Sequence, residues 1–270
     1  MIYLDNIKWK TIGALGLLCS LTVPALAGTP FNVDDPGTAE PHHVQLDLAA
    51  ITGQVRGSES DVLPSVSFGY GATDTVELDL GLSAGSIRNS GSDRVSGLGD
   101  TTAGVKWRFQ EETASRPQLA VSGQIKFPTA SRSRGLGSGR YDYTPGLSLG
   151  KSFGKYAFCA GAGYNFVGDP DAKNNTYYGV CLTYQTTEKT TVGAQIYGNT
   201  AAASGQRDEL AYGIGATCNY QPNQSLQVMV GRSMHGFSDL NVYAGLEFDF
   251  GPKAAPATPA PAEAASEKKG

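Results

Sequence analysis

Ser233 and His235 are the side chains whose types and spacing come nearest to nucleophilic catalysis. Residues two apart share one face of a β-strand, so this serine and this histidine could lie side by side in an extended segment. A catalytic triad also needs a carboxylate or amide that orients the histidine, and the sequence offers no convincing candidate. We therefore predict that the chain is not an enzyme, with no catalytic residue and no cofactor. A lipid-acting hydrolase at His235 is the least favoured alternative.

Cys159 and Cys181 form the second pair with chemical potential. They fall on successive predicted strands, and a hairpin centred near Pro170 would place them directly opposite one another. Opposed Cα atoms in an antiparallel pair lie about 4.5–5.5 Å apart, which suits a disulfide in an oxidising compartment. Two buried free thiols, or a register that differs by one residue, are the alternatives. Cys218 is expected on the lipid face as a small apolar residue, and no spacing here resembles a metal site.

A rhythm of strands must position these residues. Alternating apolar and polar segments run from His42 to Phe250, and the connections between them alternate short and long; the longer ones include residues 86–97 and 129–139. Because bacterial outer-membrane barrels have short periplasmic turns and longer external loops, this rhythm favours an antiparallel up-and-down transmembrane β-barrel over a secreted β-sandwich. The predicted strands, about twelve, span residues 42–54, 61–71, 74–86, 98–110, 117–128, 140–152, 155–167, 175–185, 189–199, 208–220, 224–234 and 240–250.

The two ends of the chain are predicted to lie outside the barrel. Residues 1–27 have the pattern of a signal peptide, with basic residues, an apolar core and a small-x-small cleavage site at Ala25–Ala27. After this core the sequence contains no apolar run long enough for a spanning helix. We predict a barrel over residues 28–250 and a disordered, Ala/Pro-rich periplasmic tail over residues 251–270.

The two faces of the predicted strands differ in polarity. Within residues 76–82, one valine and three leucines share a face, and Glu77 and Asp79 share the other. An apolar face suits lipid, and a polar face suits the lumen of a barrel. Aromatic residues gather at predicted strand ends, which is typical of girdles at the two membrane interfaces. The predicted periplasmic girdle includes Trp107 and Phe109, and the predicted external girdle includes Tyr164, Tyr177 and Tyr197.

Polar side chains on the inward face are the candidates for lining the lumen. A barrel of about twelve strands has a narrow interior that side chains can largely fill, and charges buried there must be paired. Two interpretations follow, namely a salt-bridged plug and a narrow pore lined by the same charges. The candidate residues are Glu77, Asp79, Lys106, Arg108, Gln124, Lys126, Glu247 and Asp249.

Three arginines mark one predicted external loop. Arg132, Arg134 and Arg140 all fall on its outer side. Guanidinium groups suit phosphate and carboxylate, so this loop could contact lipopolysaccharide in the outer leaflet or attract anionic aromatic acids. With a formal net charge of -4 and no basic patch elsewhere, the chain is not predicted to bind nucleic acid.

Several motifs carry a family resemblance. Gly97–Asp100, Val105–Phe109 and Phe127–Ala130 resemble the outer-membrane family labelled putative meta-pathway phenol degradation, also described as a transporter family. The last strand, Tyr243–Phe250, is similar to the sorting signal read by the bacterial barrel-assembly machinery. The resemblance covers residues 40–250 and implies an outer-membrane channel for passive uptake of small hydrophobic or aromatic compounds. A non-conducting structural or adhesion barrel, which would bind a partner through its external loops or tail, is the alternative.

Overall fold

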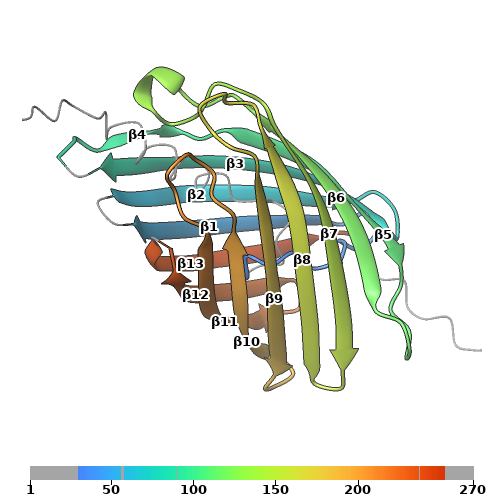
Figure 1. Cartoon of the computed structure of the whole chain (residues 1–270). Coiled ribbons are helices and arrows are strands. Elements are labelled where there is room, and N and C mark those ends of the chain that lie inside the picture. Colours follow the sequence, from blue (N-terminus) through green and yellow to red (C-terminus); the bar gives the residue numbers. More distant parts are fainter. Residues whose placement is uncertain (1–29, 56–57, 90, 237, 253–270) are drawn as a thin grey trace, which may run out of the picture.

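The computed structural model describes most of the chain between residues 30 and 252 (Figure 1). The predicted signal peptide and nearly all of the predicted tail lie outside the described residues. No helix in the described part of the chain is long and apolar enough to cross a membrane. The described residues are 30–55, 58–89, 91–236 and 238–252.

Strands dominate the described residues, and one short 3-10 helix, η1 (Arg132–Arg134), lies in a connecting loop. Successive side chains of a strand point to opposite faces, which is the period of the sequence pattern. The strands are β1 (Val44–Val55), β2 (Ser58–Gly71), β3 (Val76–Asn89), β4 (Val95–Leu98), β5 (Thr101–Gln110), β6 (Gln118–Phe127), β7 (Asp142–Phe153), β8 (Tyr156–Val167), β9 (Asn175–Gln185), β10 (Thr190–Asn199), β11 (Glu209–Gln221), β12 (Gln224–His235) and β13 (Ser238–Phe250).

These strands form one antiparallel sheet that closes into a barrel. β1 pairs with β2 on one edge and with β13 on the other. Because β4 and β5 both pair with β3, they act as one interrupted strand, and the thirteen strands fill twelve positions. In Figure 1, β1–β3 run across the view and β8 and β9 run along it, as expected for tilted strands on opposite walls. The predicted up-and-down barrel is confirmed.

One predicted loop is largely strand. Residues 86–97 were expected to form a long external connection, but β3 continues to Asn89 and β4 begins at Val95. The irregularity lies instead between β4 and β5, where the backbone N–H of Gly99 donates to the carbonyl of Ser83 over 2.9 Å. The carboxylate of Asp100 turns toward the next loop and accepts the backbone N–H of Ala130 over 2.9 Å. This side-chain contact joins the break between β4 and β5 to the loop that follows β6.

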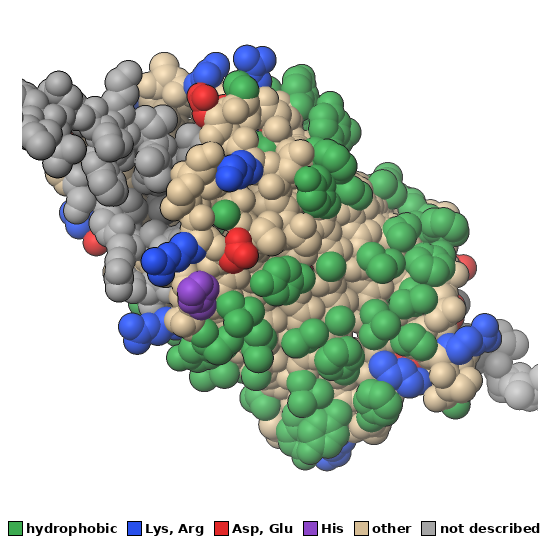
Figure 2. Space-filling view, in the orientation of Figure 1, with side chains coloured by type: hydrophobic (Ala, Val, Ile, Leu, Met, Phe, Trp, Pro, Cys, Tyr) green, Lys and Arg blue, Asp and Glu red, His purple; other side chains and the backbone are tan. Residues whose placement is uncertain are grey.

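The outer wall of the barrel is apolar. Leucine and valine side chains along the strands are exposed, and hydrophobic side chains spread over the wall in Figure 2. Trp107 and Phe109 are exposed at the periplasmic end and Tyr164 at the external end. A closed barrel with this outer surface is the architecture of the bacterial outer membrane, where the chain resides. The prediction for Tyr177 and Tyr197 is wrong, because both turn into the lumen.

His43, directly before β1, ties the first strand to the last. Its Nδ1 lies 2.5 Å from Oδ1 of Asp249, and its Nε2 lies 3.5 Å from Oε2 of Glu40. The hydrogen bond with Asp249, helped by the charge of both carboxylates, raises the pKa of His43. Because the folded-state pKa is the higher one, protonated His43 stabilises this rim below a pH of about 6.5. That contribution is lost as the pH rises through the raised pKa.

We predict that Asp249→Asn lowers the pKa of His43 toward that of a free histidine, because the amide carries no charge. Titration of ring-labelled histidine by NMR in detergent micelles measures the change. Glu40→Gln is the matched control and should lower the pKa of His43 less, since Glu40 makes the longer contact. An unchanged pKa in Asp249→Asn would exclude this hydrogen bond as the cause.

Candidate functional site: the lumen of the barrel

Residues 30–41, here called the N-terminal segment, lie inside the barrel and cross its periplasmic half (Figure 1). Phe31, Val33, Asp34 and Ala39 are buried there. The segment is fastened by hydrogen bonds to side chains of four strands and by one backbone bridge to a fifth. These are Asn32 N–H to Gln195 Oε1 (2.8 Å), Tyr177 O–H to Asp34 Oδ2 (2.8 Å), Lys106 Nζ to the carbonyl of Gly37 (2.9 Å) and Ala39 N–H to Glu77 Oε2 (2.5 Å), with Pro41 bridged to Gly71 of β2.

Inward-facing glycines make room for the N-terminal segment. A Cβ on Gly161 of β8 would lie 3.0 Å from Cβ of Asp34, and one on Gly179 of β9 would lie 2.6 Å from Cγ2 of Val33. Gly161 and Gly179 are directly paired across the two strands. The segment therefore packs against bare backbone, where any side chain would displace it.

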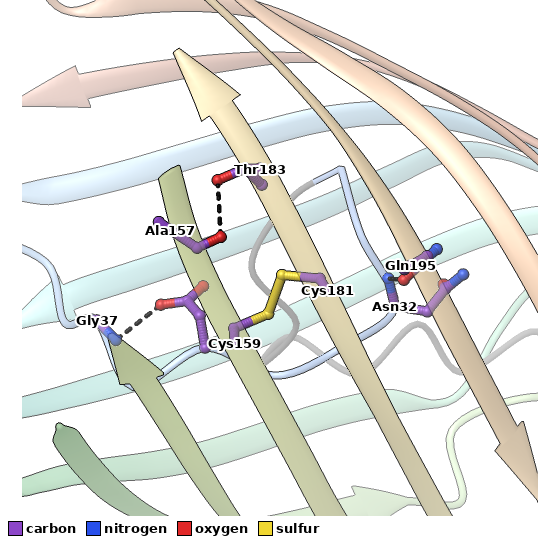
Figure 3. The surroundings of a disulfide bond; sticks show 8 residues. Asn32, Gly37, Ala157, Cys159, Cys181, Thr183 and Gln195 are labelled. Carbon is purple, nitrogen blue, oxygen red and sulfur yellow. Dashed lines mark hydrogen bonds between the residues drawn. A yellow bond between two sulfur atoms is a disulfide. The ribbon is translucent and has the colours of Figure 1, made fainter. Parts of the chain in front are cut away.

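The disulfide Cys159–Cys181 lies beneath the N-terminal segment (Figure 3). The two cysteines are directly paired between β8 and β9, with their Cα atoms 5.0 Å apart. Val33 packs against the side chains of both cysteines, and Tyr197 packs against the same cluster. The parity that turns Cys181 inward also turns Tyr177, four residues before it on β9, toward Asp34. Cys218 is a free thiol on β11.

Carboxylates outnumber cations in the periplasmic half of the lumen. Lys106 Nζ lies 3.6 Å from Oε1 of Glu77, and both side chains are buried. Asp79 is 94% buried, and its Oδ2 has no hydrogen-bond partner among the described residues. Glu247 accepts a hydrogen bond of 2.8 Å from Gln227. No group of three metal-binding side chains is found in the described part of the chain.

Arg108 and Asp249 lie at the periplasmic rim and do not join this set. Arg108 Nε is 2.9 Å from Oε1 of Glu111, in the turn that follows β5. Asp249 pairs with His43 at the closure of the barrel. The predicted interior network of salt bridges is therefore smaller than expected, because strand ends bring these two side chains to loop partners.

A second ionic cluster lies in the external half of the lumen. Lys126 Nζ is 2.6 Å from Oδ2 of Asp142 and 3.3 Å from Oδ2 of Asp100. Gln124, the preceding inward residue of β6, is also buried, and its Nε2 has no partner among the described residues. Pairing with two carboxylates offsets the desolvation of the ammonium group, and it joins β6 to β7 and to the bend before β5.

The predicted loop arginines lie above this cluster. Arg132 and Arg134 belong to η1, Arg140 follows in the same loop, and all three are exposed. The loop itself folds back, so that Ala130 and Leu136 pack against Val62 and Ile87 of the barrel wall. Contact of the arginines with lipopolysaccharide or anionic solutes stays a prediction.

Ser233 and His235 do not lie side by side. Ser233 pairs with Ala211 and His235 pairs with Leu210, so Met234 is an extra residue in β12. Neighbouring residues of β11 point to opposite faces, and the bulge therefore places the serine and the histidine on opposite sides of the wall. Ser233 Oγ instead donates a hydrogen bond of 2.6 Å to Glu209. The expected shared face is wrong.

Apolar side chains form two clusters in the lumen. One cluster at the external end contains Val62, Ile87, Ala130 and Leu136, and Ile51 packs against it. A second cluster contains Ala49, Met229 and Tyr243, and Ile51 packs against this one too. The lumen thus has apolar clusters as well as charged groups, and β1 and β13 carry both, since Asp47 and Glu247 are paired on the same two strands.

The chain is similar in sequence to one protein family and in fold to several solved structures. The model of the family described as "Putative MetA-pathway of phenol degradation" matches residues 27–246. Among solved structures, the COG4313 outer membrane channel from Pseudomonas putida F1 is similar with a TM-score of 0.68 and 16% identity, over 80% of this chain and 99% of that one. A KdgM porin in complex with disordered oligogalacturonate has a TM-score of 0.53 and 9% identity, over 76% and 99%. The NanC porin has a TM-score of 0.53 and 10% identity, over 75% and 98%. No curated protein matches significantly.

The sequence interpretation missed the N-terminal segment. Two signals could have found it: the apolar residues Phe31 and Val33 ahead of the first strand, and glycines at inward positions of successive strands, such as Gly161 and Gly179. Neither signal is specific by itself, because loops also carry apolar residues and barrel walls are rich in glycine.

We predict that Gly161→Leu expels the N-terminal segment and raises single-channel conductance at least several-fold over the wild type, because the leucine would overlap Asp34. Planar-bilayer recording of the refolded chain measures this change. Gly123→Leu is the matched control, since nothing lies within 4 Å of its Cβ position. Equal conductance of Gly161→Leu and wild type would show that the segment does not obstruct the pore.

The disulfide gives a separate prediction. After denaturation without reductant, an alkylating reagent should modify Cys218 and leave Cys159 and Cys181 unmodified, because only a free thiolate reacts. Peptide mass spectrometry before and after reduction counts the labelled sites. Labelling of Cys159 and Cys181 without reductant would contradict the bond.

Proposed function

Because the chain belongs to this phenol-degradation family, we propose that it is an outer-membrane channel for the passive uptake of small hydrophobic or aromatic compounds. The observation that carries the proposal is the apolar cluster at the external mouth of the lumen, where Leu136 packs against Val62 and Ile87. A channel for ions or sugars gains nothing from apolar side chains at its entrance. An apolar entrance favours solutes that leave water readily.

We infer that the N-terminal segment obstructs the route through the lumen in this conformation. The segment is bonded to Gln195 inside the barrel, and the side chains of Gln195 and Gln227 are almost fully buried. Passage of a solute therefore requires the segment to move, and its hydrogen bonds to Gln195 and Glu77 are exchangeable with water. The same closed lumen favours a second candidate, a structural or adhesion barrel that conducts nothing.

Solute uptake by cells tests the proposal. The full chain is expressed in a Gram-negative host that lacks its general porins, and the initial uptake of labelled toluene and benzoate is compared with that of sucrose. We expect faster uptake of the aromatic solutes than in the same host without the chain, and no change for sucrose. Equal aromatic uptake with and without the chain would contradict the channel and support the non-conducting alternative.

One variant ties uptake to the apolar entrance. Leu136→Asp should lower aromatic uptake by about tenfold, because a charge buried among Val62 and Ile87 is costly to desolvate. Ser133→Asp is the matched control, since it adds the same single charge at an exposed position of the same loop. A similar loss in both variants would point to the charge of the loop and away from the apolar cluster.

A further inference from the structure

One row of directly paired, inward-facing residues crosses eight strands without a charged side chain. Directly opposite residues in an antiparallel sheet share a face, so every member of the row faces the lumen. The only polar atom among its side chains is the hydroxyl of Tyr243. The row, here called the apolar row, runs Gly193, Gly215, Met229, Tyr243, Ile51, Val62, Gly85 and Gly97, on β10, β11, β12, β13, β1, β2, β3 and β4.

The apolar row runs obliquely to the barrel axis, from the periplasmic side toward the external side. Directly paired residues lie along a line perpendicular to the strands, and tilted strands incline this line to the barrel axis. Gly193 lies near the periplasmic end of β10, Ile51 lies in the middle of β1, and Gly97 lies near the external end of the interrupted strand that β4 and β5 form. The row therefore spirals from the periplasmic half of the lumen to its external mouth.

At each end of the apolar row, a hydrophobic side chain packs closely against glycine. At the periplasmic end, Cζ of Phe31 lies 2.6 Å from where a Cβ of Gly193 would stand, and its Cε1 lies 3.3 Å from that of Gly215. At the external end, Cδ1 of Leu136 lies 2.5 Å from the Cβ position of Gly97. The phenyl ring of Phe31 thus marks a place in the wall that fits one aromatic ring.

The middle of the row is continuous and apolar. Ile51 packs against both lumen clusters, the one with Val62 and the one with Met229. Met229 and Val62 are almost fully buried. A methionine side chain has three rotatable bonds and adapts to what it contacts, so it can change rotamer as a solute passes.

The ionic clusters lie off this line. The Lys106–Glu77 pair is at the periplasmic ends of β5 and β3, far below the point where the row crosses β3 at Gly85. Lys126 is on β6, beyond the last strand of the row. A solute that follows the apolar row therefore passes neither lysine cluster. The nearest carboxylates, Asp47 and Glu247, are paired on β1 and β13 four residues from Ile51 and Tyr243, toward the periplasmic end.

We propose that the apolar row is the path of hydrophobic solutes through this barrel, with Ile51 and Val62 as its specificity-determining residues. This inference rests on the proposed function. A monocyclic aromatic solute enters where Leu136 meets Gly97 and passes over Val62, Ile51 and Met229. It reaches the position beside Gly193 and Gly215 when the phenyl ring of Phe31 leaves the lumen with the N-terminal segment.

Added polarity tests the path; Val62→Thr keeps the shape of the side chain, and Ile51→Thr exchanges its ethyl arm for a hydroxyl. The double variant Ile51→Thr/Val62→Thr adds two hydroxyl groups to the row, and toluene uptake by cells should fall about tenfold because a hydroxyl buried without a partner is unfavourable. Ionic conductance should stay at the wild-type level. Thr102→Val is the matched control, because Thr102 is a buried residue of β5 outside the row and its Oγ1 has no partner among the described residues; it should leave both measurements unchanged.

The outcomes separate the path from the function. If wild-type cells take up toluene and the double variant does so equally fast, the apolar row is not the path. If wild-type cells show no toluene uptake above the host, the proposed function fails first. Folding of every variant is checked by its heat-modifiable band on a gel.

A size filter gives a second readout if the double variant does not fold. Ile51→Ala widens the middle of the row, so uptake of naphthalene relative to toluene should rise at least several-fold. An unchanged ratio in a folded Ile51→Ala protein would also overturn the path.

Discussion

Closure of the sheet between β1 and β13 is the constraint on which the rest of this structure depends. Lipid offers no hydrogen-bond partner to a backbone N–H or carbonyl group, so an open edge would be prohibitively unfavourable. The pairing runs from Val44 opposite Phe250 to the external ends of both strands. Because the sheet is closed, every strand residue faces either the lipid or the lumen. The polarity of each position is therefore set by its parity along a strand.

Closure also creates an interior that must be filled. Twelve positions enclose a lumen too narrow for a broad aqueous channel, yet polar groups point into it. The protein fills the periplasmic half with its own N-terminal segment, which supplies backbone groups and the Asp34 carboxylate to Gln195, Glu77 and Tyr177. Glycine on the wall allows this close approach. The disulfide between β8 and β9 holds the wall on which Val33 lies.

The contents of the lumen are divided by chemistry. Charges gather in two compact clusters around Lys106 and Lys126, where each ammonium faces carboxylates. Apolar side chains gather along a line that joins the external loop to Phe31. Such a division suits the proposed uptake of solutes of low polarity, because the lysine ion pairs lie away from the proposed path.

The sequence by itself determined the barrel, its two faces and the opposition of Cys159 to Cys181, because alternation and hairpin spacing are local and register follows from them. Its interpretation failed where a feature depends on contacts remote in sequence. The bulge at Met234 separates Ser233 from His235, the continuation of β3 and β4 shortens a predicted loop, and Tyr177 turns inward to Asp34. Only the tertiary structure placed the N-terminal segment in the lumen. Its contacts with Gln195 and Tyr177 join residues more than one hundred positions apart, and no local period encodes such pairings.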